Sequence, residues 1–91
     1  MNKSELIRKL SEESNLPMED AVMIVNTFIN SIKDALLAGD RVEIRGFGSF
    51  KMKDYNGYTG RNPRTGDCVA VKPKRLPFFR AGKDLKDFIN Q

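Results

Sequence analysis

The first apolar positions of the chain follow the period of an α-helix. Leu6, Ile7 and Leu10 fall on one side of a helical wheel. Asn2 precedes them and is a favoured N-cap, and an acidic residue three positions later completes a pattern typical of a capping box. We therefore predict a short first helix that ends near Asn15.

A second and longer apolar stripe follows Pro17. Proline suits the first turn of a helix, two acidic residues directly after it suit the positive end of the helix dipole, and Gly39 suits the C-terminal end. The stripe consists of Ala21, Val25, Phe28, Ile29, Ile32 and Leu36. Further apolar residues lie outside the stripe, at Val22, Ile24, Ala35 and Leu37. A helix this broadly apolar indicates burial against more than its own chain, although burial within one fold would explain the breadth too.

After Gly39 the pattern changes to the alternation of β-strands. Residues 41–53 alternate on both sides of the glycine turn 46–48, which predicts a hairpin. Residues 68–72 alternate again, and residues 76–80 form a short apolar segment in which Pro77 predicts an edge strand or a bulge. The last ten residues return to helical spacing, which predicts a short C-terminal helix.

Residues 54–67 fit neither pattern. Tyr55 and Tyr58 are their only bulky apolar side chains, and three glycines interrupt them between strand-like flanks. A structureless loop of this length is uncommon in a compact domain unless it has a function. We predict a projecting two-stranded arm with a turn at Pro63, which lies between Arg61 and Arg64.

The charge of the chain divides unevenly along its length. Residues 1–40 carry four basic and seven acidic side chains, a net charge of −3, whereas residues 41–91 carry twelve basic and five acidic side chains, a net charge of +7. This asymmetry predicts a basic face built by the second part of the chain, with a polyanion as its natural partner. A solvated basic surface without a partner is the alternative.

The residue inventory offers little for catalysis or metal binding. The 91 residues include no histidine, one cysteine (Cys68) and no paired carboxylates at catalytic spacing, so we expect no enzyme activity, metal site, cofactor or small-molecule substrate. No apolar run approaches the length of a membrane span, and no secretory signal pattern precedes the first helix. We expect a cytoplasmic protein that contacts no membrane.

Three segments together resemble the bacterial HU and integration host factor family. They are "VEIRGFGSF" at 42–50, "GRNPRTG" at 60–66 and the pattern F-x-x-G-K-x-L-K at 79–86. The segment "GRNPRTG", at this distance after "RGFG", is highly specific for the family. The resemblance covers essentially the whole chain.

The resemblance implies an α+β fold that assembles as an intertwined dimer. Residues 1–91 form a single DNA-binding domain in this interpretation: a helix-turn-helix dimerisation base (1–40), a three-stranded antiparallel sheet (41–81) with a protruding β-arm at about 54–72, and a short C-terminal helix (82–91). It also implies a nucleoid-associated protein that binds double-stranded DNA, either as a homodimer or paired with a related subunit.

The resemblance implies roles for individual residues. Pro63 matches an intercalating proline, a mechanism for which these proteins are themselves reference examples. Arg61, Asn62 and Arg64 match the neighbouring minor-groove positions. Positions that contact DNA phosphates are matched by Lys3, Arg45, Gly46, Gly48, Lys53, Lys72, Lys74, Arg75, Arg80, Lys83 and Lys86, and dimer or core positions by Phe28, Ile29, Ile32, Phe47, Phe50 and Phe79.

Two departures and one ambiguity concern the arm and the strands. Tyr55 and Tyr58 stand where many relatives carry basic residues, and they either pack across the arm or lie against sugars in the groove. The glycines of the turn serve either the turn alone or phosphate contact as well. We assign Phe78, like the other phenylalanines of the strands, to the core.

Three functions follow as hypotheses. The first is an architectural protein that bends duplex DNA with little sequence preference, with an integration-host-factor-like sequence preference as a near variant. The second is an RNA or single-strand binder, which would need more exposed aromatic residues than the two tyrosines. The third, an enzyme such as a nuclease, lacks the residues for its chemistry.

Overall fold

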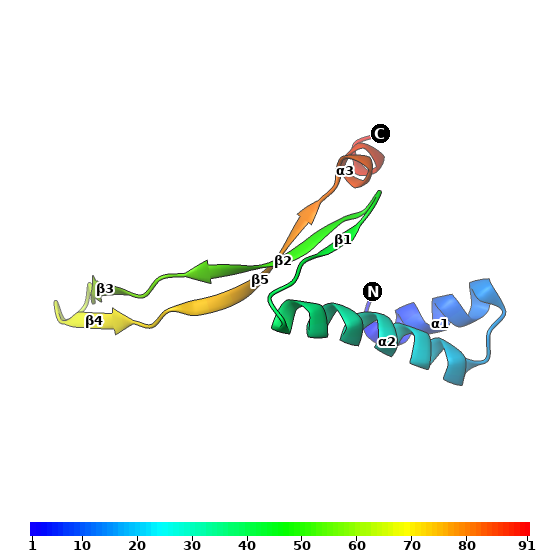
Figure 1. The fold of residues 1–91 in the computed structure, drawn as a ribbon, viewed down its shortest axis with the longest axis horizontal. Helices are drawn as coiled ribbons and strands as arrows, with labels where there is room; N and C mark the ends of the chain where they lie inside the picture. Colours follow the sequence, from blue (N-terminus) through cyan, green and yellow to red (C-terminus); the bar gives the residue numbers. More distant parts are fainter. The chain divides into compact units, whose positions relative to one another are not determined.

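The computed structural model describes residues 1–91, which divide into two compact units, Met1–Asp34 and Ala35–Gln91 (Figure 1). Each unit is described by itself. No helix is both long enough and apolar enough to cross a membrane.

The helical unit contains α1 (Lys3–Ser14) and most of α2 (Met18–Leu37). The Asn2 side chain caps α1 by accepting a hydrogen bond from the backbone N–H of Glu5 (2.9 Å), as predicted. Asn15 ends the helix in the left-handed conformation (φ 56°). Ala21 and Val25 are the only buried apolar side chains of the chain, and both lie on α2. The two predicted helices are therefore confirmed with nearly the expected ends.

The second unit opens with the end of α2 and a glycine turn. Gly39 has φ 81° and donates its N–H to the carbonyl of Leu36 (3.1 Å), and Asp40 donates to Ala35 (2.9 Å). These bonds satisfy carbonyls that the helix leaves free at its C-terminus. A side chain other than glycine would be strained at this φ, so Gly39 sets where α2 stops.

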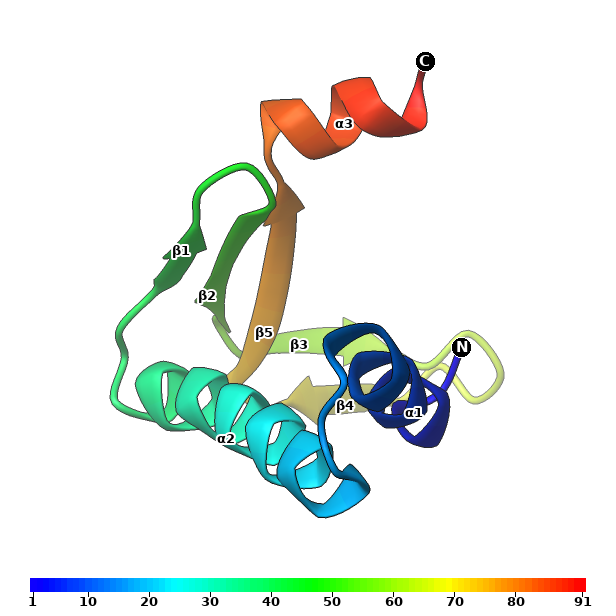
Figure 2. The same ribbon diagram turned by 90° about the vertical axis from the view of Figure 1, so that its right-hand side faces the viewer.

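A three-stranded antiparallel sheet in the order β1-β2-β5 forms the body of this unit. It consists of β1 (Val42–Ile44), β2 (Gly48–Tyr55) and β5 (Lys74–Ala81), and α3 (Lys83–Ile89) follows directly at the end of β5 (Figure 2). Pro77 lies on the edge strand β5 and pairs with Met52 without a bulge. Of the two predictions for Pro77, the edge strand is correct.

The arm is a separate two-stranded ribbon of β3 (Tyr58–Arg61) and β4 (Cys68–Val71). Figure 1 shows β2 leading out into β3 and β4 leading back into β5. The ladder is interrupted beside Pro73, which has no N–H to donate. Gly57 lies on the other side of this interruption, between β2 and β3. A Cβ atom at Gly57 would lie 2.7 Å from the Val71 carbonyl oxygen, so only glycine fits there.

Helices and antiparallel strands thus share one chain, and the predicted α+β fold is confirmed.

Candidate nucleic-acid interface

The register of β2 and β5 divides the side chains of the sheet between two faces. Directly opposite residues of an antiparallel pair project to the same face, and successive residues alternate. The pairs Ser49–Arg80, Lys51–Phe78 and Lys53–Leu76 therefore share one face. We call this six-residue set the basic face; it has three cations and no carboxylate of its own, and the next pair, Tyr55–Lys74, continues the same face with a fourth cation.

The opposite face is apolar near the centre of the sheet. Phe50 pairs with Phe79, and their ring centroids are 4.8 Å apart. Phe47 reaches the same ring from the turn, at 5.3 Å. These three rings, all predicted dimer or core positions, lie close together, while Phe47 and Phe79 remain 42% and 37% exposed in the single chain.

Phe78 departs from the prediction. Phe78 directly precedes Phe79 in an extended strand, so the two rings project to opposite faces of the sheet and only Phe79 lies with Phe50. Phe78 instead lies half-buried on the basic face, with the Lys53 Nζ 3.7 Å and the Lys51 Nζ 5.9 Å from its ring centroid. Lys51 was not among the expected phosphate contacts, and the strand alternation around Lys53 was the signal that could have identified it.

Arg75 lies on the other face, unlike the neighbouring lysines with which it was grouped. It pairs with Asp54, and the Nε–Oδ1 distance is 3.4 Å. Its guanidinium also donates a long hydrogen bond of 3.5 Å to the Leu36 carbonyl. Within the chain Arg75 thus contacts both the sheet and the end of α2, and its contact with a DNA phosphate stays a prediction.

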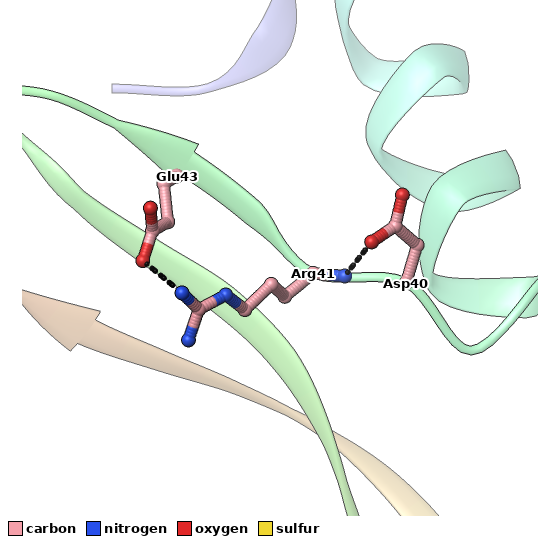
Figure 3. A network of polar contacts seen from close by, with 3 residues as sticks. All are labelled: Asp40, Arg41 and Glu43. Atoms are coloured by element: carbon pink, nitrogen blue, oxygen red, sulfur yellow. Dashed lines mark hydrogen bonds and ion pairs between the residues drawn. The ribbon is translucent and has the colours of Figure 1, made fainter.

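Glu43 is a carboxylate beside the basic face, because it pairs with Ser49. Figure 3 shows its side chain meeting the guanidinium of Arg41, at 2.8 Å, while Asp40 accepts a hydrogen bond from the Arg41 backbone N–H (2.8 Å). Arg41 offsets the negative charge of Glu43 at this edge, so the face as a whole stays basic.

The turn between β1 and β2 and the start of α3 form an open hollow at the end of the sheet. Four of the predicted phosphate-binding cations line it, together with Glu43 and Asp87: these four are Arg45, Arg80, Lys83 and Lys86. Gly46 has φ 85°, a conformation that favours glycine. A Cβ atom at Gly48 would lie 2.5 Å from the Arg80 carbonyl oxygen and 2.6 Å from the Phe79 ring, so Gly48 is required for packing.

The tip of the arm is an ordered turn around Pro63. Asn62 accepts a hydrogen bond from the Gly66 N–H (2.8 Å) through its carbonyl and one from the Arg64 N–H (2.9 Å) through its side chain. Its own N–H donates to the Asp67 carbonyl (2.7 Å). The half-buried Asn62 thus shapes the turn, and Pro63, Arg61 and Arg64 are left exposed on it.

The remaining predicted residues lie in different places. Lys72 and Lys74 are exposed where the arm returns to the sheet, and Tyr55 is paired with Lys74. Tyr58 pairs with Val71, and its exposed ring lies along its own strand, 3.4 Å from where a Cβ atom of Gly60 would be, so its packing across the arm stays a prediction. Lys3 is the first residue of α1, in the helical unit, and its contact with a DNA phosphate stays a prediction.

Comparison with known proteins agrees with this geometry. The family model described as "Bacterial DNA-binding protein" matches residues 1–90. An Anabaena HU protein in a DNA cocrystal structure is 31% identical, with a TM-score of 0.87 over 98% of this chain and 97% of that one. HU from Thermotoga maritima is 29% identical (TM-score 0.69; 98% of each chain), and a mutant of transcription factor 1 is 26% identical (TM-score 0.65; 99% of this chain, 91% of that one).

Proposed function

The chain belongs to the family of bacterial DNA-binding proteins, and on this premise we propose that it is a nucleoid-associated architectural protein that bends double-stranded DNA as a homodimer. The observation that carries the proposal is the combination of the basic face with an arm whose exposed tip bears Pro63 between two arginines. The similarity to an HU protein crystallised with DNA supports duplex DNA as the partner.

The cations of the sheet and hollow and the arginines of the arm would bind DNA in different ways. Cations of the sheet and of the hollow would contact phosphates, which position a protein on a duplex without reading its sequence. The arm would enter the minor groove, whose electronegative character attracts arginine. Little sequence preference is expected, because no side chain in this scheme reads the base edges of the major groove.

The arm tip would convert binding into bending. The ring of Pro63 is compact, apolar and without an N–H, so it can enter between base steps and partly unstack them. Unstacking costs a few kcal/mol, and contacts between the bent duplex and further basic surface offset this cost. The hydrogen bonds of Asn62 hold the turn in shape while the wedge is inserted.

The exposed apolar surface supports a homodimer. Only Ala21 and Val25 are buried among the apolar side chains, while Phe28 is 55% and Met23 is 61% exposed. A single small domain that buries so little would be marginally stable. A second copy that covers α2 would supply the missing core and would place a second arm on the DNA.

The test is a bending assay by energy transfer between the two ends of a random-sequence duplex, at fixed salt, with single-stranded DNA and RNA as competitors. The proposal expects duplex binding with a clear approach of the ends and weak competition by both single strands. Tight binding without bending would contradict the architectural role. Preference for RNA would contradict duplex DNA as the partner.

A further inference from the structure

An aromatic ring lies between the cations of the basic face. Phe78 is half-buried on β5, and the Lys53 Nζ stands 3.7 Å from its ring centroid while the Lys51 Nζ stands at 5.9 Å. Cations are attracted to the face of an aromatic ring within about 6 Å of its centroid. Lys53 therefore lies well within the range of this attraction, and Lys51 lies at its limit.

The two ammonium groups are free of competing partners within the chain. The ion pairs of the protein join Lys9 with Glu13, Arg41 with Glu43, and Arg75 with Asp54. None involves Lys51 or Lys53. Arg75 differs from these two lysines, because its guanidinium forms an ion pair with the Asp54 carboxylate at 3.4 Å.

The geometry points to a positioning role for Phe78: we propose that its ring holds Lys53, and more weakly Lys51, in the conformation in which their ammonium groups meet DNA phosphates. This inference rests on the proposed DNA-binding function. Phe78 itself need not touch DNA.

Pre-organisation is the physical reason that the ring increases affinity. A lysine on a flexible four-carbon stem loses rotamer freedom when it binds a phosphate. The ring restricts Lys53 before DNA arrives, so less freedom remains to be lost. An ammonium group has three donors, and the ring covers one side of it, so the other side stays open to a phosphate oxygen.

The experiment is a double-mutant cycle read out by affinity for a random-sequence duplex at low salt. Phe78→Leu removes the ring but keeps an apolar side chain, and Lys53→Met removes the cation but keeps the stem. Phe78→Leu is expected to weaken binding about two- to fivefold in the otherwise unchanged protein, and to have almost no effect in the Lys53→Met background.

Two controls separate positioning from a structural role. Phe78→Tyr keeps an aromatic face and is expected to restore the original affinity. Lys72→Met removes a cation of equal charge with no aromatic partner in the structure, so its effect should add to that of Phe78→Leu. Unfolding midpoints of all variants show whether a loss of affinity reflects a loss of fold.

The outcomes separate the inference from the function on which it rests. If the unchanged protein does not bind duplex DNA, the proposed function fails. If it binds and Lys53→Met weakens it, but Phe78→Leu adds independently or Phe78→Tyr fails to restore affinity, the positioning role is wrong and the function stands. If Lys53→Met has no effect, the inference is wrong too, because Lys53 then contacts no phosphate.

Discussion

Pro63 is one exposed residue on which bending depends in this proposal. It lies within the turn Asn62–Gly66, whose shape is fixed by hydrogen bonds that do not involve the proline ring. The ring can therefore be removed without dismantling the turn. Its effect on DNA can be tested apart from the fold.

Pro63→Ala should reduce bending of an intact duplex more than it reduces binding to nicked or already kinked DNA. A nicked duplex has lost part of its stacking, so less energy is needed to open the step. The measurement compares energy transfer and affinity on matched straight and nicked duplexes. Equal losses of affinity on both would show that Pro63 is not a wedge.

Gly48 is a second residue whose role the structure defines. Gly48→Ala would bring a methyl group within 2.5 Å of the Arg80 carbonyl oxygen and 2.6 Å of the Phe79 ring. We expect a loss of about 1–3 kcal/mol in the free energy of unfolding, because backbone atoms must move to relieve the contact. Urea denaturation measures it.

Gly60→Ala is the matched control, since its methyl group would meet only the Tyr58 ring, at 3.4 Å. Its stability should stay within about 0.5 kcal/mol of the unchanged protein or rise slightly. Equal stability of the two variants would contradict the packing role of Gly48.

At the scale of elements, α3 and the β1–β2 turn act together. The start of α3 brings Lys83 and Lys86 to the hollow that Arg45 and Arg80 also line. No single strand or helix carries all four cations. The end of the sheet assembles them from segments about forty residues apart in sequence.

Lys83→Ala and Lys86→Ala should each make the affinity for duplex DNA less dependent on salt. Each phosphate contact contributes about −0.9 to the slope of log affinity against log salt, so each variant should lower the magnitude of the slope by about one. Lys33→Ala is the control: it removes the same charge from an exposed position on α2. An unchanged slope for either α3 variant would remove that lysine from the interface.

At the scale of the whole molecule, the unfolding of the protein should depend on its concentration. If two chains share one core, the unfolding midpoint in urea must rise with protein concentration, because dilution favours the separated and unfolded chains. A tenfold increase corresponds to about 1.4 kcal/mol of additional stability per mole of dimer. Sedimentation over the same concentrations measures the assembly directly, and a stable monomer with a constant midpoint would contradict the dimer.

The sequence alone predicted the elements of this protein and the place of its arm. Asn2, Pro17 and Gly39 are local signals whose effects reach only a few residues, so the two helices could be predicted with nearly correct ends. The strands followed from alternation, and the arm followed from a polar, glycine-rich segment between them. The motif around Pro63 indicated the family, which the family model confirms.

Only the tertiary structure decided which cations share a surface. Sequence placed Lys53 and Arg75 in one group, but the register of β2 and β5 puts them on opposite faces and gives Arg75 a carboxylate partner. The same register places Phe78 on the basic face, next to Lys53, whereas the sequence had assigned it to the core. Periodicity within one strand determines which residues share its face, whereas pairing between strands that are distant in sequence determines what lies opposite them, and that pairing depends on contacts throughout the sheet.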